Sequence, residues 1–112
     1  MPEHFLYLTT IGRTSGLPRE IEIWFVERLG RHYLISEHRE ESGWVKNLRA
    51  RSTVRFSVGT RQNHAAGLAE TPARARVIDD EEEPELATAV RALMDARYRW
   101  SEGLIVELTP ER

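Results

Sequence analysis

The sequence predicts a mainly β domain: a small antiparallel barrel or sandwich that carries two helices. Three observations lead to this class. Apolar residues alternate with polar ones in several short runs, the links between these runs are short, and only two stretches have a helical period. Six strands and two helices in 112 residues fill one domain, residues 1–112. Six short strands usually close on themselves, because closure limits exposed edges.

The first three strands are predicted before residue 38. Residues 5–11 are rich in aromatic and β-branched side chains, which favour strands. In residues 19–27, Ile21, Ile23 and Phe25 alternate with polar neighbours, as in a half-buried strand. A turn at residues 29–31 contains a glycine and leads into a strand over residues 32–37, so that these two strands form a hairpin.

A short helix and two strands are predicted next. Ser42 is a suitable N-cap for a helix over residues 43–50. Residues 53–59 alternate again, with Val54, Phe56 and Val58 on the buried face. Residues 64–78 are interpreted as one strand that is interrupted near Thr71 and Pro72, because proline cannot donate to a central ladder.

The second helix is predicted over residues 84–97, and a closing strand over residues 103–109. Leu86, Val90, Leu93 and Met94 share one side of this helix at helical spacing. Pro84 suits the first turn, and the acidic run over residues 79–85 suits the positive end of the helix dipole.

Composition excludes several classes of protein. The chain contains no cysteine, which excludes disulfides, thiolate metal sites and cysteine nucleophiles and is compatible with a cytoplasmic protein. We find no secretory signal and no transmembrane run of about 20 apolar residues. Residues 1–70 carry 10 Lys or Arg against 8 Asp or Glu, whereas residues 71–112 carry 6 against 10. This balance is not basic enough to make a nucleic acid the expected partner.

A loop between the first two strands is a candidate anion site. Glycines at positions 12 and 16 flank Arg13, Thr14 and Ser15, and Arg19 follows shortly after. Such a loop can offer backbone N–H groups to an anion, and two arginines can make bidentate contacts to a phosphate or carboxylate. The alternative is an ordinary polar hairpin loop.

The start of the first helix is a second candidate site. Trp44 can cover a flat heterocycle, Asn47 can pair with its edge, and Lys46 adds a cation. The alternative is that Trp44 only seats the helix on the barrel. The four histidines show no metal-ligand spacing, and a Gly-x-Ser-x-Gly nucleophile motif is absent.

Together these motifs resemble the deazaflavin-dependent nitroreductases. The resemblance rests on the Leu-Thr-Thr-x-Gly-Arg-x-Ser-Gly-x-Pro-Arg string of residues 8–19, on Trp44-x-x-Asn47-Leu48-x-Ala50, and on the ending over residues 105–110. It spans nearly the whole chain, with three motifs in the family order. It implies a split β-barrel like that of pyridoxamine-phosphate oxidases. The implied coenzyme is reduced deazaflavin F420, and the implied activity is hydride transfer to a quinone, nitroaromatic or activated enone.

The resemblance also implies a set of coenzyme-binding residues. The glycine-rich loop holds the phosphate and acidic tail, the end of the third strand passes along the coenzyme, and the start of the short helix contacts it. In this sequence these residues are Arg13, Thr14, Ser15, Arg19, Ser36, Glu37, His38, Trp44, Val45, Lys46 and Asn47.

The sequence departs from the family pattern at two positions. Thr14 stands where the family often has lysine, and Glu22 lies near a common proline, where an inward carboxylate would repel an anionic tail.

Tyr98 follows the last helix and is the best candidate proton donor, unless it only packs under the helix end. A homodimer acting on a small-molecule substrate is expected. The alternatives are an FMN-binding flavin reductase or oxidase, a non-catalytic binder of a flavin or an anion, and a small oligonucleotide-binding barrel.

Overall fold

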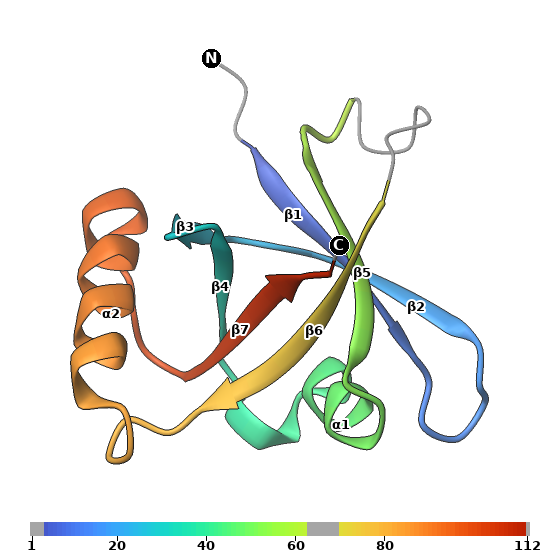
Figure 1. Ribbon diagram of the computed structural model, residues 1–112. Helices are drawn as coiled ribbons and strands as arrows, with labels where there is room; N and C mark the ends of the chain where they lie inside the picture. The colour runs from blue at the N-terminus through green and yellow to red at the C-terminus, as the bar shows by residue number, and fades with distance from the viewer. Residues whose placement is uncertain (1–3, 63–69, 112) are drawn as a thin grey trace.

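The chain folds into one curled antiparallel sheet with two helices on its outside (Figure 1). This computed structural model describes residues 4–62 and 70–111. In chain order the elements are β1 (Phe5–Ile11), β2 (Pro18–Ile23), β3 (Val26–Arg28), β4 (Arg31–Ser36), the 3₁₀ turn η1 (Arg39–Glu41), α1 (Gly43–Ala50), β5 (Thr53–Gly59), β6 (Thr71–Ile78), α2 (Pro84–Tyr98) and β7 (Leu104–Pro110).

One continuous stretch of chain forms both edges of the sheet. The strand order is β2-β1-β5-β6-β7-β4-β3, and all neighbours are antiparallel. Because β2 and β3 are consecutive in the chain, residues 18–28 run from one edge to the other. The expected mainly β class with two helices is confirmed. The single strand predicted over residues 19–27, however, is two strands, so that the sheet has seven strands among the described residues where six were expected.

The break between β2 and β3 is a corner that a distant tyrosine stabilises. The Tyr98 hydroxyl donates to the carbonyl oxygen of Phe25 at 2.9 Å and accepts from its N–H at 3.2 Å. These backbone groups would otherwise belong to a strand ladder, so the tyrosine satisfies them where the ladder stops. The chain then turns back through Leu29 and Gly30, which have φ values of 53° and 78°. Two successive positive φ values are typical of a tight hairpin turn.

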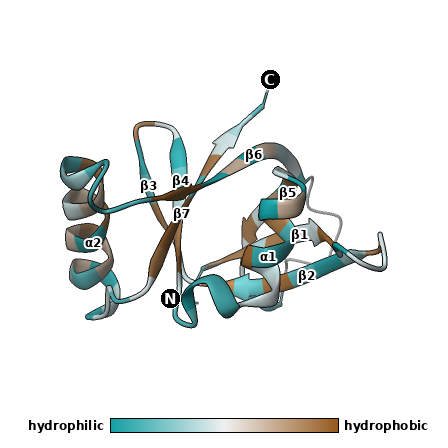
Figure 2. Cartoon of the chain, turned by 90° about the horizontal axis from the view of Figure 1, so that it is seen from below, coloured by the Kyte–Doolittle hydropathy of each residue, from teal (hydrophilic) through white to brown (hydrophobic). Residues whose placement is uncertain are grey.

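Two apolar clusters lie on the two faces of the sheet. The cluster inside the barrel contains Leu6, Leu8, Phe56 and Leu108, together with Leu48 of α1. The second cluster lies between the sheet and α2, where it includes the partly buried Trp100. Figure 2 shows hydrophobic colouring along β7, which lies between the two helices. Each helix therefore covers a different apolar surface of one sheet.

Both helices begin where the sequence predicts, with differences in detail. Ser42 is the N-cap residue of α1, but its hydroxyl makes no capping bond and instead contacts the hydroxyl of Ser36 at 2.7 Å. In α2 the fully buried side is formed by Ala87, Val90 and Met94. The prediction for Leu93 was wrong, since 39% of this residue is exposed. The small Ala87 lets α2 approach the sheet on that side instead.

The remaining strands agree closely with the prediction. Strand β5 has the predicted bounds, and β7 is shifted by one residue. The prediction that Val58 faces inward was wrong, since 36% of this residue is exposed near the end of β5. Strand β6 begins at Thr71, with Pro72 beside Arg55 near its start, where a missing N–H is tolerated. Residues 64–69 of the predicted strand lie outside the described residues.

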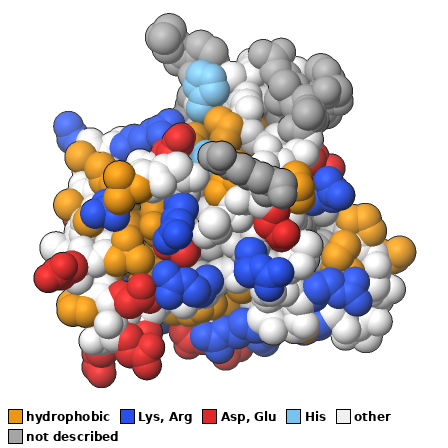
Figure 3. Space-filling model, viewed as in Figure 1, with side chains coloured by type: hydrophobic (Ala, Val, Ile, Leu, Met, Phe, Trp, Pro, Cys, Tyr) orange, Lys and Arg blue, Asp and Glu red, His pale blue; other side chains and the backbone are white. Residues whose placement is uncertain are grey.

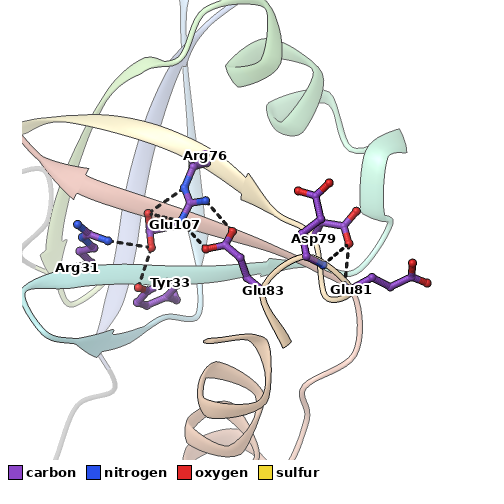
Figure 4. Close-up of polar contacts among 8 residues, drawn as sticks. Arg31, Tyr33, Arg76, Asp79, Glu81, Glu83 and Glu107 are labelled. Carbon is purple, nitrogen blue, oxygen red and sulfur yellow. Dashed lines mark hydrogen bonds and ion pairs between the residues drawn. The ribbon is translucent and has the colours of Figure 1, made fainter. Parts of the chain in front are cut away.

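A buried carboxylate joins three strands on the α2 side of the sheet (Figure 4). The Glu107 side chain is 3% exposed, accepts a 2.8 Å hydrogen bond from the Tyr33 hydroxyl, and forms ion pairs with Arg76 and Arg31 at 3.2 and 3.5 Å. Arg76 also bridges to Glu83, just before α2. Burial raises the pKa of Tyr33, and the hydrogen bond to Glu107 acts in the same direction. The network fixes the register of β4, β6 and β7.

His32 lies in the barrel core, where it introduces a pH dependence of stability. Its ring lies between Phe25 and Phe56, at centroid distances of 5.8 and 4.7 Å, and its Nδ1 has no hydrogen-bond partner among the described residues. Burial lowers the pKa of His32, although Glu27 opposes this shift. The unfolded chain therefore binds more protons than the folded chain below the ordinary histidine pKa of about 6.5.

We expect the free energy of unfolding of the wild type to fall between pH 7.5 and pH 5.5 by more than that of His32→Phe, which cannot titrate. Urea unfolding of both proteins at the two pH values measures this difference. An equal loss in both proteins would show that other groups cause the pH dependence.

The surface charge follows the uneven distribution in the sequence. On the face seen in Figure 3, basic side chains spread across the middle of the molecule, and acidic ones gather at the lower left, near the start of α2. Asp79, which accepts hydrogen bonds from the N–H groups of Glu81 and Glu82, and Asp80, which pairs with Arg91, belong to this acidic region. Among the described residues, no helix is long and apolar enough to cross a membrane.

Candidate functional site

A basic cavity of about 400 Å³ lies between the β1–β2 loop and the start of α1. Both candidate sites of the sequence meet here, because residues 34 positions apart form hydrogen bonds to each other. Its lining residues are Gly12, Arg13, Thr14, Ser15, Arg19, Ile21, Gly43, Trp44 and Asn47. Two guanidinium groups, two hydroxyls and a half-buried indole thus surround one space.

The loop that lines this cavity needs its glycines. A Cβ on Gly12 would collide with the Ser15 hydroxyl, and Gly16 has a φ of 72°, which favours glycine. The Gly12 N–H donates to the Leu17 carbonyl, and the Gly16 N–H donates to the Gly12 carbonyl, both at 2.8 Å. The loop is therefore a defined tight turn, and its exposed side chains stand around the cavity.

Asn47 connects this loop to α1. It is 6% exposed, and its Oδ1 accepts hydrogen bonds from the Arg13 side chain at 2.8 Å and from the Arg13 backbone N–H at 3.2 Å. Its Nδ2 donates to the Thr10 hydroxyl at 3.2 Å. In the structure the carbonyl oxygen of Asn47 fixes Arg13 in place, and the pairing of Asn47 with the edge of a ring stays a prediction.

We expect Asn47→Ala to lower the free energy of unfolding by about 1–3 kcal/mol, because it leaves buried polar groups without partners. It should also weaken anion binding at the loop, because Arg13 loses its anchor. Urea unfolding and coenzyme titration measure the two effects. Arg49→Ala, at an exposed position of the same helix, is the matched control and should change neither quantity. A stable Asn47→Ala protein would show that the loop does not depend on this residue.

A second, larger cavity of about 620 Å³ adjoins the first at Trp44, which lines both. One side is formed by the ends of β2 and β4 and the other by the last part of α2 and the residues after it. The lining residues are Phe5, Glu22, Ile23, Trp24, Ile35, Ser36, Glu37, His38, Ser42, Trp44, Arg61, Met94 and Trp100. The chain thus offers a basic space and an aromatic space that share Trp44 as a common wall.

Aromatic rings form one wall of the larger cavity. Trp24 lies parallel to Tyr98 at a centroid distance of 4.5 Å, and Trp100 meets Trp24 edge to face at 6.3 Å. The Tyr98 hydroxyl is bonded to the backbone of Phe25, the residue after Trp24. Although 37% of Trp24 is exposed, it is therefore held in place before any ligand arrives.

Glu22 places a carboxylate in the wall of the larger cavity, where Arg61 neutralises it. The Arg61 guanidinium donates to both oxygens of Glu22 at 2.9–3.2 Å, and the Tyr7 hydroxyl donates to Oε2 at 2.8 Å. Burial and the bond to Glu22 raise the pKa of Tyr7 to about 12, so this phenol stays protonated. Glu22 does not line the basic cavity, so the repulsion foreseen from the sequence does not arise there.

The polar end of the larger cavity is a rigid turn between β4 and α1. The buried Ser36 hydroxyl donates to the Arg39 carbonyl oxygen at 2.9 Å and contacts the Ser42 hydroxyl. The Glu41 N–H donates to the carbonyl oxygen of His38. These bonds fix the backbone that carries Glu37 and His38 at the cavity wall.

Nine of the twelve predicted site residues line one of the two cavities, and three do not. Val45 is fully buried, and Lys46 pairs with Glu41 at 3.4 Å on the surface of α1. Tyr98 supports the cavity wall from behind and does not line it, and its assignment as proton donor stays a prediction. Sequence reasoning missed Trp24. The sequence did contain a signal for it. Trp24 follows Glu20 and Glu22 on the same face of the predicted strand, where a polar residue is expected and an aromatic one stands.

Among residues 4–62 and 70–111, no group of three or more His, Asp or Glu side chains gathers in a way that could hold a metal ion.

The sheet order and the two joined cavities define the class of the protein: a split barrel with the pyridoxamine-phosphate-oxidase-like fold. The chain belongs to the F420H₂-dependent quinone reductase family, whose sequence model matches residues 1–103. Among curated proteins, none matches this sequence.

Solved structures with the same fold include proteins with different described functions. An F420-H₂-dependent reductase is 21% identical, with a TM-score of 0.56 and coverage of 93% of this chain and 92% of that chain. A protein described as a pyridoxamine 5′-phosphate oxidase from Listeria innocua is 17% identical, with a TM-score of 0.70 and coverage of 96% and 84%. The haem storage protein HutZ from Vibrio cholerae is also 17% identical, with a TM-score of 0.74 and coverage of 96% and 82%.

Proposed function

We propose that this protein binds reduced coenzyme F420 and passes its hydride to a quinone, nitroaromatic or activated enone. The observation that carries the proposal is that two unlike cavities share Trp44 as a common wall. The basic cavity suits a phosphate and an acidic tail, and the aromatic cavity suits a flat ring system with room for an acceptor. Family membership supports the same coenzyme and a quinone as acceptor.

The residues of the basic cavity would hold the charged part of the coenzyme. Arg13 is positioned in advance by Asn47, and Arg19 extends from the start of β2 with its side chain exposed. Charge-assisted contacts from both arginines to phosphate or carboxylate oxygens are among the stronger hydrogen bonds in proteins. The hydroxyls of Thr14 and Ser15 add donors at the same loop.

The residues of the larger cavity would orient the rings and exclude water. When bound, the reduced deazaflavin supplies the hydride and releases one proton to water. Trp44 provides a flat surface at the junction of the cavities, and Trp24 with Trp100 provides an opposing aromatic wall. Because Arg61 neutralises Glu22, this wall carries little net charge toward the rings.

Binding titrations and turnover assays test the proposal. The purified protein is titrated with F420 and, separately, with FMN, and the reduced complex is then mixed with a naphthoquinone, a nitroaromatic and a cyclic enone. We expect F420 to bind and at least one acceptor to be reduced. Tight binding of FMN alone would indicate a flavin reductase or oxidase, and coenzyme binding without turnover would indicate a carrier. Either result would contradict the proposal.

We further propose that the protein acts as a homodimer. A chain of 112 residues must supply both a core and a cavity, and small domains bury a smaller share of their surface. Exposed residues that line the larger cavity, such as Glu37 and Trp24, leave part of it at the surface that a second copy would cover. Light scattering at micromolar concentration should give twice the mass of the chain, and a monomer mass would contradict this expectation.

A further inference from the structure

Reduction of a quinone or enone in the larger cavity needs a proton as well as a hydride, and this inference rests on the proposed function. The hydride brings two electrons and forms a new bond to the acceptor. The acceptor then carries a negative charge on oxygen, and an O–H bond must form at that atom. A side chain that donates this proton from within the cavity removes the need for water to enter.

The cavity wall contains four titratable or charged side chains among the described residues, and three of them are poor donors. Glu22 forms an ion pair with Arg61 and accepts a hydrogen bond from the Tyr7 hydroxyl. A guanidinium such as that of Arg61 does not release a proton in proteins. Glu37 and His38 are both exposed, so exposure does not separate them; the difference lies in the side chain, because a carboxylate accepts hydrogen bonds and has no proton to donate.

His38 is the fourth of these groups, and its chemistry suits the task. Histidine is the side chain whose ordinary pKa lies nearest neutral pH, so that its two protonation states interconvert under working conditions. No described residue forms a hydrogen bond or ion pair with its imidazole, and the turn that carries it is fixed through Ser36 and Ser42. The alternative donor, Tyr98, has its hydroxyl on the Phe25 backbone behind the wall.

We infer that His38 is the general acid that protonates the reduced acceptor. The imidazolium N–H bond breaks as the O–H bond of the product forms, and the neutral imidazole takes a new proton from water at the exposed side of the turn. The other charged groups that line the cavity are Glu22 and Arg61, which pair with each other, and Glu37, the neighbour of His38 in the chain.

Steady-state kinetics of His38→Gln with reduced F420 and a naphthoquinone test the inference. With saturating reduced coenzyme, we expect kcat to fall by about 10²-fold while KM for the quinone stays within a few-fold of wild type, since general acids contribute a factor of this order. The wild-type kcat should decrease as pH rises from 5.5 to 8, and the variant should lose this dependence. Added imidazole should restore turnover to His38→Ala. His4→Gln, at an exposed position outside both cavities, is the matched control.

A binding experiment without coenzyme gives an independent readout. In protein labelled at the histidine ring carbons, 1-naphthol, a phenol that resembles the reduced acceptor, should shift the NMR signal of His38 and its titration curve, and leave His4 unchanged. Unchanged kcat in His38→Gln, an unaltered His38 signal at saturating naphthol, or loss of the pH dependence in Tyr98→Phe instead would overturn the inference. Failure of the wild type to bind F420 would contradict the proposed function and is seen separately in the coenzyme titration.

Discussion

Replacement of both Arg13 and Arg19 by alanine is expected to weaken binding of reduced F420 by about 100-fold or more. Each charge-assisted contact contributes about 1.5–3 kcal/mol, and about 1.4 kcal/mol corresponds to a tenfold change in affinity. Each single variant should therefore lose about tenfold or more. Fluorescence titration of the coenzyme measures the affinities.

The two single variants should differ in stability. Arg19 is exposed at the start of β2, so its loss should barely change the melting temperature. Arg13 donates to Asn47, so Arg13→Ala should also lower the melting temperature slightly. Arg74→Ala, which removes an exposed arginine outside both cavities, is the control for net charge. Equal affinity in the double variant and the Arg74 control would exclude the basic cavity as the coenzyme site.

Glu107→Ala is expected to cause the largest loss of stability of any single substitution considered, about 2–4 kcal/mol. The change leaves the buried Tyr33 hydroxyl without its acceptor. It also removes the carboxylate, itself 3% exposed, with which Arg76 pairs. Arg31 and Arg76 are about half exposed, so water compensates them in part, and the ion pairs alone contribute less than a fully buried pair would.

Urea unfolding of Glu107→Ala measures this loss, and Glu102→Ala, at an exposed position just before β7, is the control. In Tyr33→Phe the unpaired hydroxyl is absent, so Glu107→Ala in that background should cost less than it does in the wild type. Equal costs in the two backgrounds would show that the Tyr33 bond does not contribute to the stability of the network.

The parts of the fold that depend on local patterns could be predicted from the sequence. The bounds of β1, α1 and β5 agree with the prediction because strong alternation or a clear N-terminal signal defines them within a few residues. The break between β2 and β3 could not be predicted in the same way. Ile21, Ile23 and Phe25 keep one alternation across it, and the corner depends on Tyr98, which is more than 70 residues away.

The candidate site likewise contains parts that local sequence patterns predict and parts that depend on contacts between distant segments. The basic loop could be recognised because its glycines and arginines are neighbours in sequence, but the hydrogen bond from Arg13 to Asn47 could not be predicted from either motif alone. The Glu22–Arg61 pair and the Trp24–Tyr98 stack join segments 39 and 74 positions apart. No local pattern contains such pairs, so the walls of the larger cavity emerge only from the fold.

The continuous stretch that forms both edges of the sheet also determines how copies of this chain can meet. Edge β3 has only three residues, too few to recruit a strand from another molecule. Edge β2 begins with Pro18, which lacks an N–H, and carries Arg19, Glu20 and Glu22, whose charges oppose stacking of identical strands. Neither edge therefore favours growth into a larger sheet, and two copies that associate must do so through the faces of their barrels.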